Sequence, residues 1–202
     1  PDRHSGFRRI VAASAFCWLG VQPIFVYMVS FLEGRMPSLG DAALGQTTAY
    51  AFLAMNGVAA LAPMLLARLA VRATALAVHV AAVALMAGGC LAIWLFAAAP
   101  WQLYLLMAIC GIGWGSIVSL PFAIMSDRVA PARMGLFMGL FNLSVVLPQL
   151  VTSLGVGTLV GAAEDKGLVF ALSGTFLGIS ALLWHLTPVT TTRSATLQGA
   201  TS

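Results

Sequence analysis

The chain has 202 residues, of which 60% are hydrophobic and only 8% carry a charge. Soluble domains carry about 25% charged residues, and no water-soluble fold of this length could bury so much apolar surface. The composition therefore excludes a soluble protein and indicates an all-α protein that spans a lipid bilayer. The net charge of +4 arises from basic residues in short gaps between apolar runs, without interleaved aromatic residues, so we expect no nucleic-acid partner.

Six apolar segments are long enough to span a bilayer, which takes about 20 helical residues. They are residues 10–31, 47–67, 74–99, 103–125, 134–160 and 168–186. We expect one six-helix transmembrane domain over 10–186, a cytoplasmic segment at 1–9, and a disordered cytoplasmic tail over the polar, low-complexity stretch at 187–202. Because the chain begins at Pro1 rather than at a methionine, we interpret it as a fragment or a processed half of a larger protein.

Basic residues are divided unequally between the two sides of the predicted domain. The side with both termini and the loops after the second and fourth spans has eight of them: Arg3, Arg8, Arg9, Arg68, Arg72, Arg128, Arg133 and Arg193. The other side has Arg35 and Lys166. Basic residues concentrate in cytoplasmic loops, so the bias predicts a multi-pass protein of the cell membrane with both termini in the cytoplasm. No charged residue lies near the middle of any span, so the chain lacks an obvious proton relay.

Polar side chains in the fifth span share one helical face. Asn142, Gln149 and Ser153 follow at steps of seven and four residues, on the same face as Gly135 and Gly139. Unpaired amides are costly in lipid, so we expect this face to point into the bundle. An amide both donates and accepts hydrogen bonds, which suits the hydroxyl groups of a sugar. The same amides could instead bond only to neighbouring helices.

The first span has a second polar face, formed by Ser14, Trp18 and Gln22 at steps of four. An aromatic ring beside an amide can hold a sugar, because the ring covers the apolar C–H face while the amide bonds hydroxyl groups. A single Trp or Asn within a helix bundle can equally serve packing. The candidate substrate-binding residues, which come from four spans, are Gln149, Asn142, Gln22, Trp18, Trp114, Ser119 and Asn56.

Glycines and prolines predict how the helices pack and bend. Small residues four apart allow close contact between helices in lipid. Such pairs occur at Gly111/Gly115, Gly135/Gly139, Gly157/Gly161 and Gly174/Gly178. Prolines interrupt the spans at positions 23, 63, 121 and 148, where they remove backbone hydrogen bonds and predict kinks; we interpret the last two as part of a transport pathway.

We expect no catalytic, metal or cofactor site. Cys17, Cys90 and Cys110 lie in apolar runs without CxxC spacing, which indicates small buried hydrophobic residues. His79 and His185 lie near the ends of their spans, where we expect them at the membrane interface. Neither histidine belongs to a metal-ligand cluster or to a Ser/His/Asp or Cys/His set, so the sequence predicts no enzyme.

The stretch at 111–155 carries the most recognisable pattern, GIGWGSIVSLPFAIMSDRVAPARMGLFMGLFNLSVVLPQLVTSLG. Its distinctive parts are GIGWGSIVSLPFA, the short charged loop with Asp127, Arg128 and Arg133, and the FNLSVVLPQ run at 141–149. This stretch resembles the major facilitator superfamily, in the branch of sucrose and maltose proton symporters. The other spans agree with that family in number, length and orientation but carry weaker motifs.

The resemblance implies a twelve-helix protein in which this chain is the second half, helices seven to twelve, built from two three-helix repeats. It implies an N-terminal six-helix half as partner, alternating access around a central site, a disaccharide substrate and a coupling proton carried by an acid of the first half. The arginine-rich loop of that family is reduced here to Arg68 and Arg72. The alternatives are a facilitator-type exporter of drugs or organic anions, a non-transporting subunit of a membrane complex, and an intramembrane enzyme.

Overall fold

The computed structural model describes residues 3–126 and 134–187, and every regular element within them is a helix. The helices are α1 (Arg3–Arg35), α2 (Asp41–Arg72), α3 (Ala75–Phe96), α4 (Pro100–Ser126), α5 (Met134–Val151), α6 (Gly157–Ala162) and α7 (Leu168–His185), with a π-helical turn (Thr152–Val156) between α5 and α6. By length and composition they provide six candidate membrane spans, which confirms the expected all-α fold. Most of the predicted charged loop, 127–133, and the predicted tail from 188 onward lie outside the described residues.

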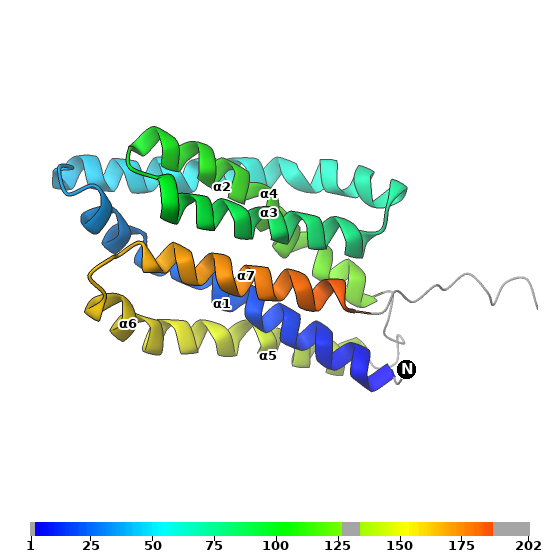
Figure 1. The fold of residues 1–202 in the computed structure, drawn as a ribbon. Helices are drawn as coiled ribbons and strands as arrows, with labels where there is room; N and C mark the ends of the chain where they lie inside the picture. The colour runs from blue at the N-terminus through cyan, green and yellow to red at the C-terminus, as the bar shows by residue number, and fades with distance from the viewer. Residues whose placement is uncertain (1–2, 127–133, 188–202) are drawn as a thin grey trace, which may run out of the picture.

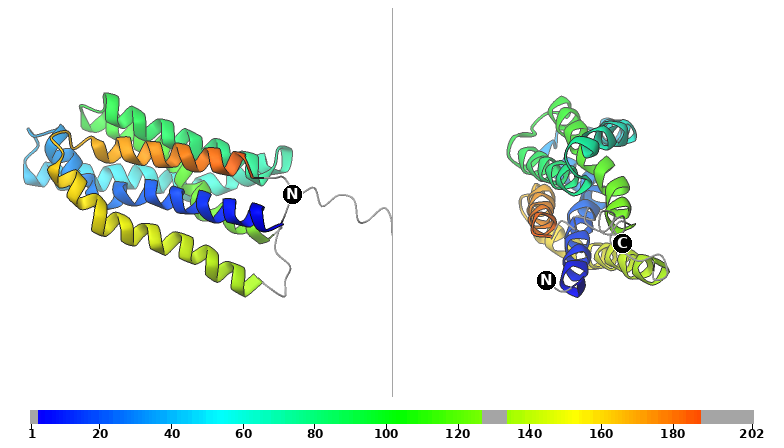
Figure 2. Two further views of the ribbon diagram at one scale, coloured as in Figure 1. Left: turned by 60° about the horizontal axis from the view of Figure 1, so that its bottom comes forward. Right: turned by 90° about the vertical axis from the view of Figure 1, so that its right-hand side faces the viewer.

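The first three crossings and the last three, the two repeats that the resemblance implies, pack mainly against each other (Figure 1). Helix α1 packs against α5 and α7, while α4 packs against α2 and α3. The two groups are joined because α3 also packs against α7. Figure 2 shows α5 at the edge of the bundle beside α1. Neither repeat is therefore a packed unit by itself.

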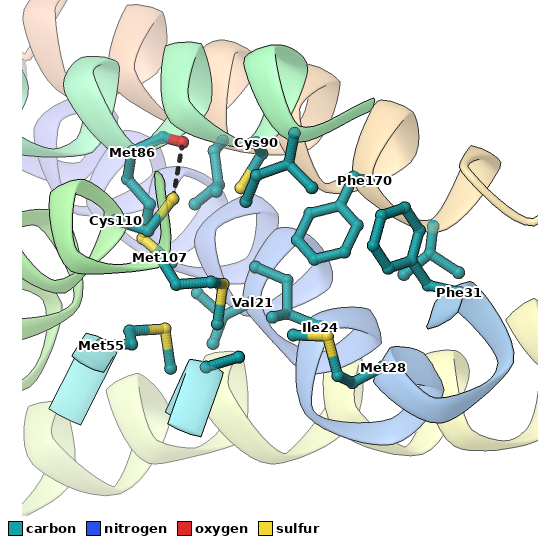
Figure 3. Packing of buried hydrophobic residues seen from close by; sticks show 14 of the residues in the cluster. Val21, Ile24, Met28, Phe31, Met55, Met86, Cys90, Met107, Cys110 and Phe170 are labelled. Carbon is teal, nitrogen blue, oxygen red and sulfur yellow. Dashed lines mark hydrogen bonds between the residues drawn. The ribbon is translucent and has the colours of Figure 1, made fainter. Parts of the chain in front are cut away.

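The hydrophobic core lies where α1, α3, α4 and α7 converge, with Met55 contributed by α2 (Figure 3). Phe31 and Phe170 meet there nearly edge to face, with ring centroids 4.6 Å apart. The thiol of Cys110 lies 3.8 Å from the carbonyl oxygen of Met86. All three cysteines are free and buried, as the sequence predicts. Dense apolar packing of this kind fixes the positions of the helices that carry polar groups.

Helix α4 approaches α2 through the predicted glycine pair. A Cβ atom on Gly111 would overlap the carbonyl group of Met55, and one on Gly115 would lie 2.9 Å from the carbonyl oxygen of Ala59. The obstacles are backbone atoms and the Cβ atoms of Val58 and Ala62, none of which can rotate away as the end of a long side chain can. This prediction of close helix contact is confirmed.

The other glycine pairs agree with the prediction only at one member each or not at all. A Cβ atom on Gly135 or Gly139 of α5 would have no atom of a described neighbour within 4 Å. In α7, a Cβ atom on Gly174 would lie 3.0 Å from the carbonyl oxygen of Ala87, while Gly178 faces open space. The spacing alone does not distinguish a glycine that touches a helix of this half from one that points outward.

Two irregular turns meet between α1 and the fifth crossing. Helix α1 departs from helical geometry at Tyr27 (φ −114°, ψ 15°), and the π-helical turn begins four residues after Pro148. The Tyr27 hydroxyl donates a hydrogen bond of 3.2 Å to the carbonyl oxygen of Thr152. Gly157 leaves room for this contact, because a Cβ atom there would lie 2.9 Å from the same hydroxyl oxygen. One side chain thus links both helix breaks.

The two ends of the bundle differ in charge. We call the end with Arg8, Arg9, Arg68 and Arg72 the basic end; there the Arg9 guanidinium donates to the carbonyl oxygen of Leu186 at 2.9 Å. The opposite end carries four acids and is called the acidic end. These acids are Glu33, Asp41, Glu164 and Asp165.

A charged cluster ties three elements together at the acidic end. Arg35, the last residue of α1, donates to the carbonyl oxygen of Trp94 and lies 3.9 Å from the Asp165 carboxylate. The Asp165 carboxylate accepts hydrogen bonds from the Gly167 backbone N–H and the Trp94 indole N–H. These two donors, and then the positive charge of Arg35, lower the pKa of Asp165 below its ordinary value.

Candidate functional site

An aromatic pair lies between α1 and α4, about halfway along both helices. Trp18 and Trp114 meet edge to face, with ring centroids 5.8 Å apart and an interplanar angle of 86°. The Trp114 indole N–H donates a hydrogen bond of 3.1 Å to the side-chain oxygen of Asn56 on α2. Three residues predicted from separate spans therefore form one cluster. It offers ring faces beside an amide, the combination that suits a ligand with apolar C–H faces and hydroxyl groups.

Phenylalanines extend this cluster into a wall. The Phe25 ring lies 5.3 Å from Trp114 and is stacked on Phe52, also at 5.3 Å, with an interplanar angle of 1°. Phe25 and Asn56 are exposed on this six-helix unit, so the wall is a surface and not part of the core. We call these residues, Trp18, Phe25, Phe52, Asn56 and Trp114, the aromatic wall. Sequence reasoning missed the phenylalanines because an aromatic residue in an apolar span usually indicates packing.

A cavity of about 150 Å³ opens beside Trp18, toward the basic end. Five helices line it, and its polar lining residues include Ser14, Asn142 and His79. Two predicted site residues, Trp18 and Asn142, thus share one cavity although they lie far apart in the chain. The cavity holds several water-sized groups, because a water molecule occupies about 30 Å³ in the liquid.

His79 lines this cavity and is enclosed by neighbouring helices. Its ring is fully buried, with Nδ1 2.8 Å from the Ser116 hydroxyl oxygen and the ring nearly perpendicular to Trp184 at 4.8 Å. Position near the start of a span did not indicate this burial. The burial results from α4 and α7, which cover the first turns of α3 and supply both partners. In contrast, His185 is exposed at the end of α7.

The polar face of α5 points out of the six-helix bundle, against the prediction. Gly135, Gly139, Asn142 and Ser153 are not buried by the described residues, and Gln149 is half-buried. The helix turns another face toward α1, and nothing in the described residues covers the glycines. The face is continuous with the cavity at Asn142, which belongs to both.

The last two predicted site residues are Ser119, whose hydroxyl group is bonded within its own helix, and Gln22, which lies near the aromatic wall. The Ser119 hydroxyl donates to the carbonyl oxygen of Gly115 at 2.6 Å, one turn earlier in its own helix. This local bond satisfies the hydroxyl group without a ligand. Gln22 lies one turn beyond Trp18 on α1 and is half-buried, beside the aromatic wall.

Comparisons with known proteins agree with this architecture. The structure is similar to the crystal structure, determined in meso, of the POT family transporter PepTSo, with a TM-score of 0.81, 15% sequence identity, and coverage of 92% of this chain and 38% of that chain. Sucrose transport protein SUT5 is 34% identical over 83 residues, both in Oryza sativa subsp. indica and in subsp. japonica. That match covers 38% of this chain and only 16% of the relative, and no family model matches the chain.

These observations define the class of protein as a multi-pass, all-helical membrane protein whose six spans form half of a larger bundle type. Within that class, the fold is similar to about two fifths of the POT family transporter PepTSo, in agreement with the half bundle expected from the resemblance at 111–155. The chain spans well under half the length of the proteins it matches.

Proposed function

We propose that this chain is the second half of a secondary active transporter that moves a sugar, of the disaccharide class, by alternating access coupled to protons. The observation that carries the proposal is the aromatic wall, in which the Trp18 and Trp114 rings stand beside the Asn56 amide. The partial sequence match to a sucrose transport protein supports the same substrate class. Asn142, Gln149 and Gln22 would add the amides that bond sugar hydroxyl groups.

The polar face of α5 supports a second six-helix half as partner. Asn142 and Ser153 are exposed on this unit, and lipid offers an amide no hydrogen-bond partner. The uncovered glycines of the same face would allow a helix of another half to approach closely. A site between two halves could then open alternately to either side of the membrane.

The charge distribution supports a cell-membrane location with both termini in the cytoplasm. The basic end would face the cytoplasm, and the acidic end would face outward. The coupling proton would need an acid from the first half, because the spans described here have no acid near mid-membrane.

The proposal is tested by uptake of radiolabelled sucrose into vesicles that contain this chain together with its N-terminal half. The double variant Asn142→Ala and Gln149→Ala should lower uptake at least tenfold, because each lost hydrogen bond costs about 1 kcal/mol and exposes an unpaired ligand hydroxyl. The matched control is Thr175→Val on the exposed face of α7, whose hydroxyl bonds only within its own helix. Unchanged uptake in the double variant would reject the site assignment.

A second candidate function is export of drugs or organic anions. The aromatic wall favours it, since stacked Phe25 and Phe52 offer flat apolar surface to an aromatic compound. Efflux of a fluorescent aromatic dye, measured in the same vesicles, separates the two functions. The exporter is favoured if dye efflux needs no sugar and the vesicles take up no sucrose. The dye efflux should then be lost in the Phe25→Ala variant.

A further inference from the structure

Two residues that line the cavity each have a buried polar atom without a hydrogen-bond partner among the described residues. These atoms are Nε2 of His79 and Nε1 of Trp184. Both side chains are fully buried, and both residues line the cavity of about 150 Å³. Buried polar atoms without a partner are rare in folded proteins because each one forfeits its hydrogen bonds to water. Two of them on residues that line one cavity point to a ligand that bonds both.

The chemistry of the two atoms restricts that ligand. The Trp184 indole nitrogen is only a donor. The other ring nitrogen of His79, Nδ1, lies 2.8 Å from the Ser116 hydroxyl oxygen. When Nδ1 carries the proton and donates it to Ser116, Nε2 becomes an acceptor. The cavity then presents one donor and one acceptor on adjacent side chains whose ring centroids are 4.8 Å apart.

We propose that His79 and Trp184 form a binding site for a hydroxyl group, which accepts a hydrogen bond from Trp184 Nε1 and donates one to His79 Nε2. An O–H group has both functions on one atom, whereas an ammonium group only donates and a carboxylate only accepts. Two sources supply this chemistry: a hydroxyl group of the transported sugar or a bound water. The first source rests on the proposed function; the site itself does not.

The surroundings favour a neutral ligand. The cavity has no Asp, Glu, Lys or Arg among its described lining residues. Its titratable lining residues are His79 and Cys17. Helix α4 contributes apolar side chains here, and α5 contributes the neutral amide of Asn142. An ion would lose its hydration in this cavity without gaining a counter-charge. A sugar held against Trp18 at the mouth of the cavity could direct one hydroxyl group inward.

Nitrogen NMR of the full chain in lipid nanodiscs tests the site without transport. The double variant His4→Asn and His185→Gln leaves His79 as the sole histidine of the chain. With labelled histidine, we expect Nε2 to resonate as a hydrogen-bonded acceptor and Nδ1 as the protonated nitrogen. A protonated Nε2 that is insensitive to hydration would overturn the proposal, because the site would then lack the acceptor that the hydroxyl group needs.

Addition of sucrose as the probe, to the labelled chain assembled with its N-terminal half in nanodiscs, distinguishes the two sources. A sugar hydroxyl should shift the Nε2 resonance and slow exchange of the Trp184 indole proton with water. A bound water instead gives the acceptor signal and a water cross-peak that sucrose does not change. The second result keeps the hydroxyl site while removing its link to the sugar, and wild-type uptake then decides the proposed function separately.

Binding measurements isolate the Trp184 donor. Replacement of Trp184 by benzothienylalanine keeps the ring shape but removes the N–H group. Sucrose should then bind about tenfold more weakly if its hydroxyl uses the site. The same replacement at Trp101, which is exposed at the start of α4, is the control. Equal affinity for both analogues, together with an Nε2 signal unaffected by the Trp184 replacement, would overturn the proposal.

Discussion

At the scale of single residues, contact with a backbone atom decides what a glycine tolerates. Gly111 and Gly139 each belong to a GxxxG pair, yet only Gly111 faces a carbonyl group of a neighbouring helix. A methyl group cannot be accommodated there without moving α2 away from α4. On α5 the same methyl group meets nothing among the described residues of this six-helix unit.

Gly111→Ala is therefore expected to destabilise the six-helix unit by about 1–3 kcal/mol, because overpacking against a backbone atom forces a helix to shift. Thermal unfolding in detergent, followed by circular dichroism, measures the effect. Gly139→Ala is the matched control and should keep the melting temperature or raise it slightly, because alanine favours the helix more than glycine does. Equal melting temperatures for the two variants would show that the contact between α2 and α4 is looser than described.

The position of a side chain can be predicted from sequence when it depends on the geometry of a single helix. The step of four from Trp18 to Gln22 follows from helix geometry, so the polar face of α1 was predictable. His79 was not, because Ser116 and Trp184, which surround it, belong to helices far away in the sequence. Nothing in the local sequence of α3 indicates which of its turns those helices cover.

At the scale of helical elements, Tyr27 connects the break in α1 to the π-helical turn before α6. Its hydroxyl is the donor to the Thr152 carbonyl oxygen, which lies in a stretch where regular helical bonding changes register. Proline positions predicted irregular helices but not this connection, since the tyrosine and the turn are 125 residues apart.

Tyr27→Phe should remove this bond while preserving the ring that packs near Gly157. We expect a loss of about 1 kcal/mol, the net contribution of one neutral hydrogen bond. Hydrogen–deuterium exchange should increase in the π-helical turn and α6 and stay unchanged in α3. Tyr50→Phe on the exposed face of α2 is the control, since the hydrogen bond of its hydroxyl is to Gln46 of the same helix. Unaltered exchange in α6 would contradict the coupling.

At the scale of the whole molecule, the acidic-end cluster joins α1, α3 and the loop before α7. The pKa of Asp165 is lowered in the folded protein, so its stabilising effect is present above the ordinary pKa of 3.8 and is lost as pH falls through the lower folded value. Neutral conditions leave the cluster intact. Because the Asp165 side chain is 56% exposed, solvent weakens the effect.

Asp165→Asn at pH 7 is expected to lower the melting temperature by no more than about 2–4 °C. The same variant should show a smaller change than the wild type when the pH is lowered from about 5 to about 3, the range in which carboxyl groups titrate. Glu164→Gln, the neighbouring exposed acid, serves as control and should keep the wild-type pH response. An undiminished acid response in the Asp165→Asn variant would assign the effect to another carboxyl group.

The number of spans was predictable because hydropathy and length are properties of each segment. The arrangement of the spans was not, since it depends on which apolar faces match. The outward face of α5 shows the reason: an amide must avoid lipid, but the sequence of one half does not reveal whether its own helices or another half provide the shelter.

The exchange of partners between the two repeats also affects how the chain is made. Helix α1 packs mainly against α5 and α7, and α7 begins at Leu168. At about 5–20 residues per second, synthesis from the end of α1 to the start of α7 takes on the order of ten seconds. During that time the α7-facing side of α1 must rest against lipid or the insertion machinery. A ribosome that pauses before α7 would therefore leave α1 in the membrane without its main partner helix. In that state α1 is accessible to quality-control proteins of the membrane.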